Sequence, residues 1–244
     1  MVFQEITSNS QGKFAKILYP INGCLHPLRM MSPSGLDHWG ITAFDDQGEP
    51  NMAVPYFPNK ETPEIVAFKG VLQDIDVQAC DFAYKNQAGL FAKKKSRDSI
   101  EDNIAPCLKT TTTKTQITKF KLPKRDDPDQ VEFWDKATMT PRQPITKGDK
   151  STLRVIFSID YFWAIKNQYG IRLTLRSVEV DLPRQLVPKA GSSPFRSTAW
   201  NHKTWVTFKN FENHDNNVLQ IFLYEQTSTF LDTSYFQILF KKNN

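Results

Sequence analysis

The chain has 244 residues, of which 39% are hydrophobic and 12% aromatic. This composition excludes a disordered chain, and the length is sufficient to bury a sizeable core. The formal net charge of +5 favours an acidic partner. The sequence shows neither an apolar run long enough to span a membrane nor a secretory signal, so we expect an intracellular protein without a membrane partner.

The positive charge is concentrated in one segment. Between Lys93 and Arg125, ten Lys and Arg residues stand against three acids, a local charge of +7, which leaves the rest of the chain at about −2. A basic run of this kind is typical of phosphate binding, but also of a solvated loop or a nuclear-import signal. It supplies four candidate phosphate contacts: Lys93, Lys94, Lys95 and Arg97.

The first part of the chain predicts short strands followed by one long helix. The strand-like runs are residues 14–19, 25–31 and 38–44, and turn signals separate them. Thr62 followed by Pro63 is typical of a helix start. Apolar residues then recur at spacings of three and four, which predicts a helix over 62–87. They are Ile65, Phe68, Leu72, Ile75, Ala79 and Phe82.

The middle of the chain predicts a long exposed loop over 92–116 and a strand over 116–122. In that strand Thr118 and Phe120 lie on one face, while Lys119 and Lys121 lie on the other. Because Phe120 is interleaved with the basic residues, all three residues 119–121 are candidate nucleic-acid contacts. A further strand is expected over 131–137.

A hairpin over 148–182 is the most informative feature of the sequence. The odd positions from 153 to 163 are all apolar, and Trp163 is therefore expected in the core. Pairing odd positions with odd positions would keep the two apolar rows together. The side chains then expected together on the outer face are Arg154, Phe162, Arg172 and Arg176. Arginine beside an exposed ring is typical of single-strand binding.

These patterns predict a mainly β protein: an OB-fold-like barrel with one inserted α-helix and a C-terminal β extension. We expect a nucleic-acid-binding domain over 1–185, a linker over 186–199 and a β-rich extension over 200–244. About 45 residues without a disulfide or metal rarely fold alone. The extension is therefore expected to pack on the main body or on a partner chain. A β-sandwich is the alternative architecture.

The sequence argues against an enzyme, a cofactor and a metal site. The four histidines are scattered, and no glycine-rich phosphate loop is present. The cysteines at 24, 80 and 107 are odd in number and lack zinc-site spacing, which favours a reducing compartment.

The hairpin resembles the closing hairpin of the single-stranded DNA-binding proteins of T7-like phages and large DNA viruses of eukaryotes. The matching residues run from Gly148 to Ile159, continue through Tyr161-Phe162-Trp163, and resume at 173–178. The predicted helix and the Lys-Lys-Lys-Ser-Arg-Asp stretch are similar in placement. The resemblance covers residues 25–183. It implies an OB fold and DNA contacts at Arg154, Phe162 and, at the strand end, Tyr161 and Trp163.

The resemblance also implies a function, which is to coat single-stranded DNA during viral replication, recombination or repair. Single-stranded DNA or RNA would be the main partner, with replication proteins and a second copy of the chain as further partners. The expected location is the host nucleus or a cytoplasmic viral replication site. One departure is the C-terminus, which is aromatic and basic where phage members are acidic. A β-sandwich virion protein that packages nucleic acid is the rival interpretation.

Overall fold

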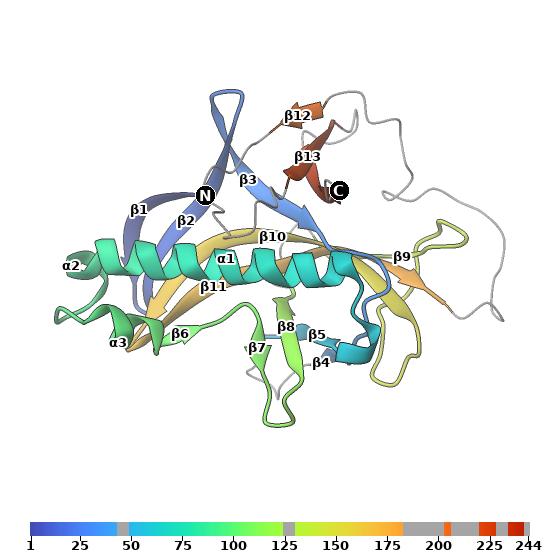
Figure 1. The fold of residues 1–244 in the computed structure, drawn as a ribbon, viewed down its shortest axis with the longest axis horizontal. Coiled ribbons are helices and arrows are strands. Elements are labelled where there is room, and N and C mark those ends of the chain that lie inside the picture. Colours follow the sequence, from blue (N-terminus) through green and yellow to red (C-terminus); the bar gives the residue numbers. More distant parts are fainter. Residues whose placement is uncertain (43–48, 124–129, 183–202, 206–219, 228–233, 242–244) are drawn as a thin grey trace.

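The computed structural model describes residues 1–42, 49–123 and 130–182, together with the backbone of strands 203–205, 220–227 and 234–241. Its main feature is a large mixed sheet crossed by one long helix (Figure 1). This confirms the mainly β class with one inserted helix. Among the described helices, none combines the length and apolarity needed to cross a lipid bilayer.

The sheet has the strand order β12-β13-β14-β3-β2-β10-β11-β8-β5-β4, and four further strands pair beside this path. The strands of the main body are β1 (Val2–Asn9), β2 (Gly12–Ile21), β3 (Cys24–Met31), β4 (Ile41–Thr42), β5 (Asn51–Tyr56), β6 (Ile104–Ala105), β7 (Lys109–Thr110), β8 (Gln116–Lys121), β9 (Glu132–Asp135), β10 (Thr152–Ile165) and β11 (Gln168–Asp181). Strands β8 and β9 confirm the predictions over 116–122 and 131–137.

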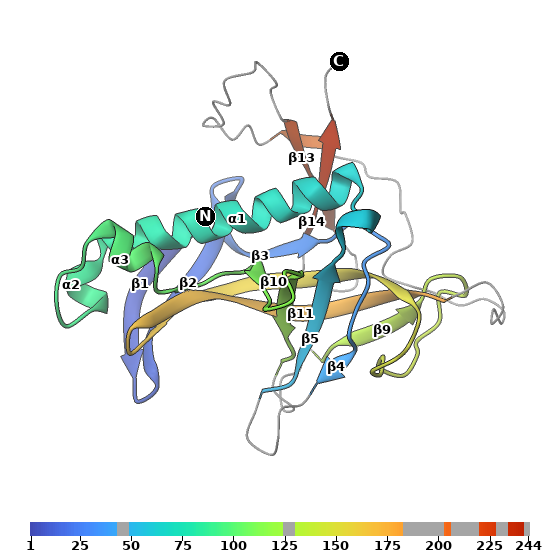
Figure 2. The same cartoon turned by 60° about the horizontal axis from the view of Figure 1, so that its bottom comes forward.

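Helix α1 (Pro63–Lys85) begins and ends close to its predicted limits. The Thr62 hydroxyl accepts a hydrogen bond from the Ile65 amide, and Pro63 occupies the first turn. The helix lies across the sheet (Figure 2) and buries the predicted apolar face against it. The described residues also form three short helices: η1 (Pro58–Lys60), α2 (Gln87–Leu90) and α3 (Arg97–Glu101).

The exposed loop predicted over 92–116 is wrong. This segment contains α3, β6 and β7, and it buries Ile100, Cys107 and Leu108. Asp76 of α1 holds it in place by accepting hydrogen bonds from the Cys107 amide at 2.9 and 3.0 Å. The many basic residues of this segment suggested an exposed loop, although these three apolar residues attach it to the core.

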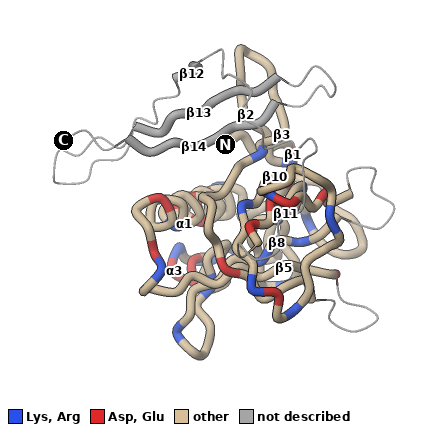
Figure 3. Tube along the Cα trace, turned by 90° about the vertical axis from the view of Figure 1, so that its right-hand side faces the viewer, with Lys and Arg blue, Asp and Glu red and all other residues tan. Residues whose placement is uncertain are grey.

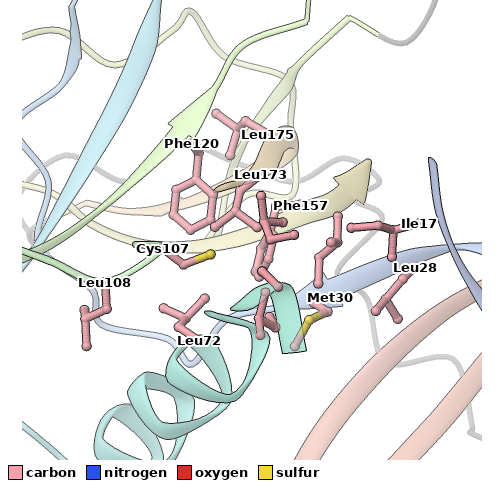
Figure 4. Close-up of a cluster of buried hydrophobic side chains, with 14 of the residues drawn as sticks. Ile17, Leu28, Met30, Leu72, Cys107, Leu108, Phe120, Phe157, Leu173 and Leu175 are labelled. Atoms are coloured by element: carbon pink, nitrogen blue, oxygen red, sulfur yellow. The ribbon is translucent and has the colours of Figure 1, made fainter. Parts of the chain in front are cut away.

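The core lies between α1 and the inner face of the sheet (Figure 4). Leu72 of α1 is fully buried there, and Phe68 meets Phe157 of β10 edge to face at 6.0 Å. Phe157 also contacts Phe120 of β8, with ring centroids 4.9 Å apart. The central hairpin β10–β11 therefore connects the helix to both halves of the sheet.

Two β-bulges interrupt the pairing of β10 with β11. Arg176 is the extra residue of β11, because Ile156 pairs with Ser177 and Phe157 with Leu175. Asp160 is the extra residue of β10, because Ile159 pairs with Leu173 and Tyr161 with Arg172. The predicted pairing of odd with odd positions holds only between these bulges. Beyond Asp160 the faces of β10 are exchanged.

The C-terminal extension forms an antiparallel meander of β12 (Lys203–Trp205), β13 (Gln220–Thr227) and β14 (Ser234–Lys241). Strand β14 pairs in parallel with β3, where Phe236 lies opposite Met30. This pairing attaches the extension to the main sheet. The linker predicted over 186–199 lies outside the described residues.

Candidate nucleic-acid interface

An open groove of about 440 Å³ is lined by residues of the β10–β11 hairpin and of the strands beside it. Its volume falls within the range of ligand-binding clefts. Strands β2, β8, β10 and β11 contribute to it, together with the segment from Ala105 to Lys109. The lining residues are Gln11, Phe14, Glu49, Ala105, Pro106, Cys107, Lys109, Ile117, Lys119, Lys121, Tyr161, Trp163, Ile165, Ile171, Arg172 and Leu173.

Three aromatic side chains line one side of the groove. Tyr161 and Trp163 lie two residues apart on β10, so they share a face, and Phe14 of β2 lies opposite Trp163. The rings of Phe14 and Tyr161 meet edge to face at 5.5 Å. All three residues are partly exposed. Part of each of the three side chains is therefore accessible to a ligand.

Basic side chains line the rest of the groove. Arg172 lies opposite Tyr161 in the ladder, with its guanidinium carbon 5.8 Å from the tyrosine ring centroid. Lys119 and Lys121 point outward from β8, and Lys109 comes from β7. The mixture of charges along β8, β10 and β11 is visible in Figure 3. Cations and rings are thus interleaved on one surface.

Among the described residues, the acidic side chain that lines the groove is that of Glu49. Its Oε2 accepts a hydrogen bond from Arg172 Nη1 at 2.6 Å and lies 3.8 Å from Lys121 Nζ. The Glu49 side chain is 43% exposed, against 14% for Arg172. The carboxylate is therefore much more exposed than the Arg172 side chain and about as exposed as Lys121, at 39%.

Two of the predicted contacts belong to the core instead. Phe162 is fully buried, and its ring lies 5.0 Å from Phe82 and 5.6 Å from Tyr169. The bulge at Asp160 turns it inward and turns its neighbours outward. Phe120 is also fully buried, because it lies on the apolar face of β8. Neither ring is accessible to a base.

Arg176 and Arg154 lie outside the groove. Arg176 Nε donates to Ser158 Oγ at 2.8 Å, and its Nη2 lies 3.3 Å from Asp160 Oδ1. The two bulge residues therefore pair with each other and stabilise the local geometry of the ladder. Arg154 lies opposite Glu179 near the other end of the hairpin, with Nε 3.8 Å from Oε1.

The basic loop between α2 and α3 does not line the groove either. Arg97 forms ion pairs at 2.8 Å with Asp81 and Glu101, and Lys95 lies over the Phe91 ring at 4.7 Å. Lys93 and Lys94 are exposed. Of the predicted contacts, the groove brings together Lys119, Lys121, Tyr161 and Arg172.

Sequence reasoning missed Phe14 and Lys109 as groove residues, and for Trp163 the alternation predicted a core position although the resemblance implied a DNA contact. Strict alternation along β10 puts Trp163 on the core face only if the strand has no bulge, and the bulge at Asp160 moves it to the opposite face. The one available signal was the polar Asp160 directly before three consecutive aromatic residues. Such a run leaves the choice of face open, since a ring is apolar whichever way it points.

One Ser–His contact raises the question of catalysis. Burial lowers the pKa of His38, which favours the neutral ring. Its Nδ1 accepts a hydrogen bond from the Gly40 amide at 3.0 Å, so the proton lies on Nε2. Nε2 therefore donates to Ser151 Oγ, 3.1 Å away, and is not placed to take the serine proton. This contact is structural.

Metal ligands do not cluster in the described residues, where no group of three or more His, Cys, Asp or Glu side chains could hold an ion. The described cysteines are free thiols, with Cys24 exposed and both Cys80 and Cys107 buried.

Comparison with known proteins gives a structural likeness without a sequence family. No family model matches the chain, and no curated protein matches it. Among solved structures, the fold is similar to that of gp2.5, a single-stranded DNA-binding protein encoded by bacteriophage T7. The TM-score is 0.41 at 16% sequence identity, over 70% of this chain and 97% of the phage protein.

Proposed function

We propose that this protein binds single-stranded DNA in the groove, without sequence specificity and without catalysis. The observation that carries the proposal is the arrangement of three partly exposed rings and four basic side chains on one open surface. The rings are Phe14, Tyr161 and Trp163. The basic residues are Lys109, Lys119, Lys121 and Arg172.

The two kinds of side chain suit the two parts of a nucleotide. A base stacked on an aromatic ring gains about 1–3 kcal/mol, and every base has a face that can stack. Lysine and arginine bind phosphates and release the counterions of the strand. A surface that combines them binds a strand through features shared by all sequences.

Stacking also explains a preference for single strands. In a duplex the faces of the bases are covered by their neighbours in the stack, so the rings of Tyr161 and Trp163 cannot reach them. An unpaired strand exposes these faces. We infer a role in covering DNA strands exposed during viral replication, recombination or repair, in keeping with the hairpin resemblance. The expected site size is about 4–16 nucleotides.

The test is a fluorescence titration of the full chain with oligo-dT, the matching duplex and oligo-U. The proposal predicts saturable quenching by oligo-dT, weaker binding of the duplex, and an affinity that falls with salt by about 0.7 log units per phosphate contacted for each tenfold rise in salt. A Trp163→Phe variant identifies the part of the quenching that arises in the groove. Equal affinity for duplex and oligo-dT, or affinity independent of salt, would overturn the proposal. Stronger binding of oligo-U would reassign the ligand to RNA through contacts to the 2′-hydroxyl.

A further inference from the structure

We propose that Arg172 and Lys121 form a phosphate subsite that Glu49 occupies in the free protein, so that a phosphate of the bound strand must displace this carboxylate. The inference rests on the proposed function and deepens it. It assigns one position along the strand to two named cations. It also assigns to Glu49 the role of a competitor that weakens binding.

The geometry of the acid supports this assignment. A single oxygen, Glu49 Oε2, lies 2.6 Å from Arg172 Nη1 and 3.8 Å from Lys121 Nζ. Arginine binds carboxylate and phosphate oxygens through the same planar donors, at similar distances. The carboxylate therefore marks a point at which a phosphate oxygen would contact both cations.

The ladder fixes the two cations independently of Glu49. Lys121 pairs with Thr174 of β11, which lies two residues from Arg172, so the two basic side chains come from adjacent strands on one face. Arg172 also lies against the Tyr161 ring. Removing the acid would leave these strand positions unchanged.

The exposed fractions of the two side chains indicate that Glu49 can leave the ion pair more easily than Arg172 can. Glu49 is 43% exposed, whereas Arg172 is only 14% exposed. Solvent screens the exposed carboxylate and weakens its ion pair with Arg172. A phosphate that also carries a base onto Tyr161 gains stacking, which the carboxylate cannot supply. The strand is therefore able to replace Glu49.

The subsite lies beside a base position. Arg172 and Tyr161 are directly opposite each other in the ladder, with the guanidinium carbon 5.8 Å from the ring centroid. A phosphate held by Arg172 therefore belongs to a nucleotide whose base can stack on Tyr161. The free nucleoside, which lacks a phosphate, has no group with which to displace Glu49.

The experiment compares Glu49→Gln with Glu5→Gln in the full chain. Both substitutions remove one negative charge from an exposed position, but Glu5 is not among the lining residues. We expect Glu49→Gln to bind fluorescein-labelled oligo-dT about three- to fivefold more tightly at low salt, since a competing ion pair is lost. Glu5→Gln should change the affinity by less than about 1.5-fold at the same salt concentration, because Glu5 lies on β1 and does not line the groove.

A double-mutant cycle tests whether Glu49 acts through Arg172. In an Arg172→Gln background, the gain from Glu49→Gln should fall below about 1.5-fold, because the 2.6 Å ion pair is already lost and only the longer 3.8 Å contact with Lys121 remains. A full gain in that background would overturn the subsite. Glu49→Ala provides a second variant with the same expected direction.

The outcomes separate this inference from the proposed function. If the natural protein binds oligo-dT and Glu49→Gln does not bind more tightly than Glu5→Gln, the inference is wrong and the groove proposal stands. If neither the natural protein nor Glu49→Gln binds oligo-dT, the proposed function fails, and the inference fails with it.

Discussion

The two faces of β10 near its turn differ sharply in burial, although residues 161–164 alternate between them. Phe162 and Ala164 point into the core, where both are buried beside the inner face of β11. Tyr161 and Trp163 point into the groove, where they remain partly exposed. One strand therefore supplies a packing face and a candidate binding face from consecutive aromatic residues.

This difference shows that one extra residue in the strand, Asp160, determines which aromatic rings are accessible to a ligand. Without the bulge at Asp160, Phe162 would face outward, and its two neighbours would face the core. The Arg176–Asp160 contact and the hydrogen bond from Arg176 to Ser158 accompany this exchange. Bulges next to binding sites commonly re-aim side chains in this way.

The largest effect is expected for Phe162→Ala. The ring is fully buried among Phe3, Phe82 and Tyr169, so its removal leaves a cavity and should lower the free energy of unfolding by about 3–5 kcal/mol. Denaturant unfolding measures this loss. The matched variant Trp163→Ala, on the other face, should lose less than half as much. Equal losses would contradict the assignment of the faces.

The next largest effect concerns the groove rings. Trp163→Ala and Tyr161→Ala should each weaken oligo-dT binding by about 1–3 kcal/mol, because a stacking platform is lost. Trp39→Ala is the control, since Trp39 is 40% exposed but does not line the groove. Binding titrations that show the same loss for Trp39→Ala would remove the distinction between groove rings and other surface rings.

A smaller effect is expected for the groove arginine. Arg172→Gln should reduce the slope of log affinity against log salt by about 0.7, which corresponds to one phosphate contact. Arg154→Gln should leave the slope unchanged, because Arg154 lies opposite Glu179 and outside the groove. Affinity measured over a range of salt concentrations provides both slopes. A change in the Arg154 variant alone would place the strand at the other end of the hairpin.

The smallest effect is expected for the exposed lysines of the basic loop. The double substitution Lys93→Gln with Lys94→Gln should weaken oligo-dT binding by less than about twofold, as a distant electrostatic effect screened by salt. The double substitution Lys119→Gln with Lys121→Gln removes the same charge from the groove and should cost more. The reverse order would identify the loop as the principal contact.

Much of the fold was predictable from local chemistry. Thr62 and Pro63 signalled the start of α1, and apolar residues at helical spacing defined its buried face. Alternation in β8 correctly separated Phe120 from Lys119 and Lys121. Strand β5 was not predicted, because it is short, contains Pro55 and is buried at every position, which removes the alternating pattern.

The candidate site was predicted only in part, and the reason is long-range pairing. Lys121 and Arg172 are close because β8 pairs with β11, and Phe14 reaches Trp163 because β2 pairs with β10. Neither of these strand pairings can be predicted from the local sequence pattern. The charge run at 93–97 was conspicuous in the sequence, yet two of its members are engaged close by: Arg97 by carboxylates and Lys95 by the Phe91 ring.

The most direct measurement is photocrosslinking of the full chain to a halogen-substituted single-stranded oligonucleotide, followed by mapping of the modified residues by mass spectrometry. Crosslinks at Tyr161, Trp163 or Phe14 are expected, because these rings would lie against the bases. Crosslinks confined to residues 93–97 or to the hairpin end near Arg154, with none in the groove, would contradict the account.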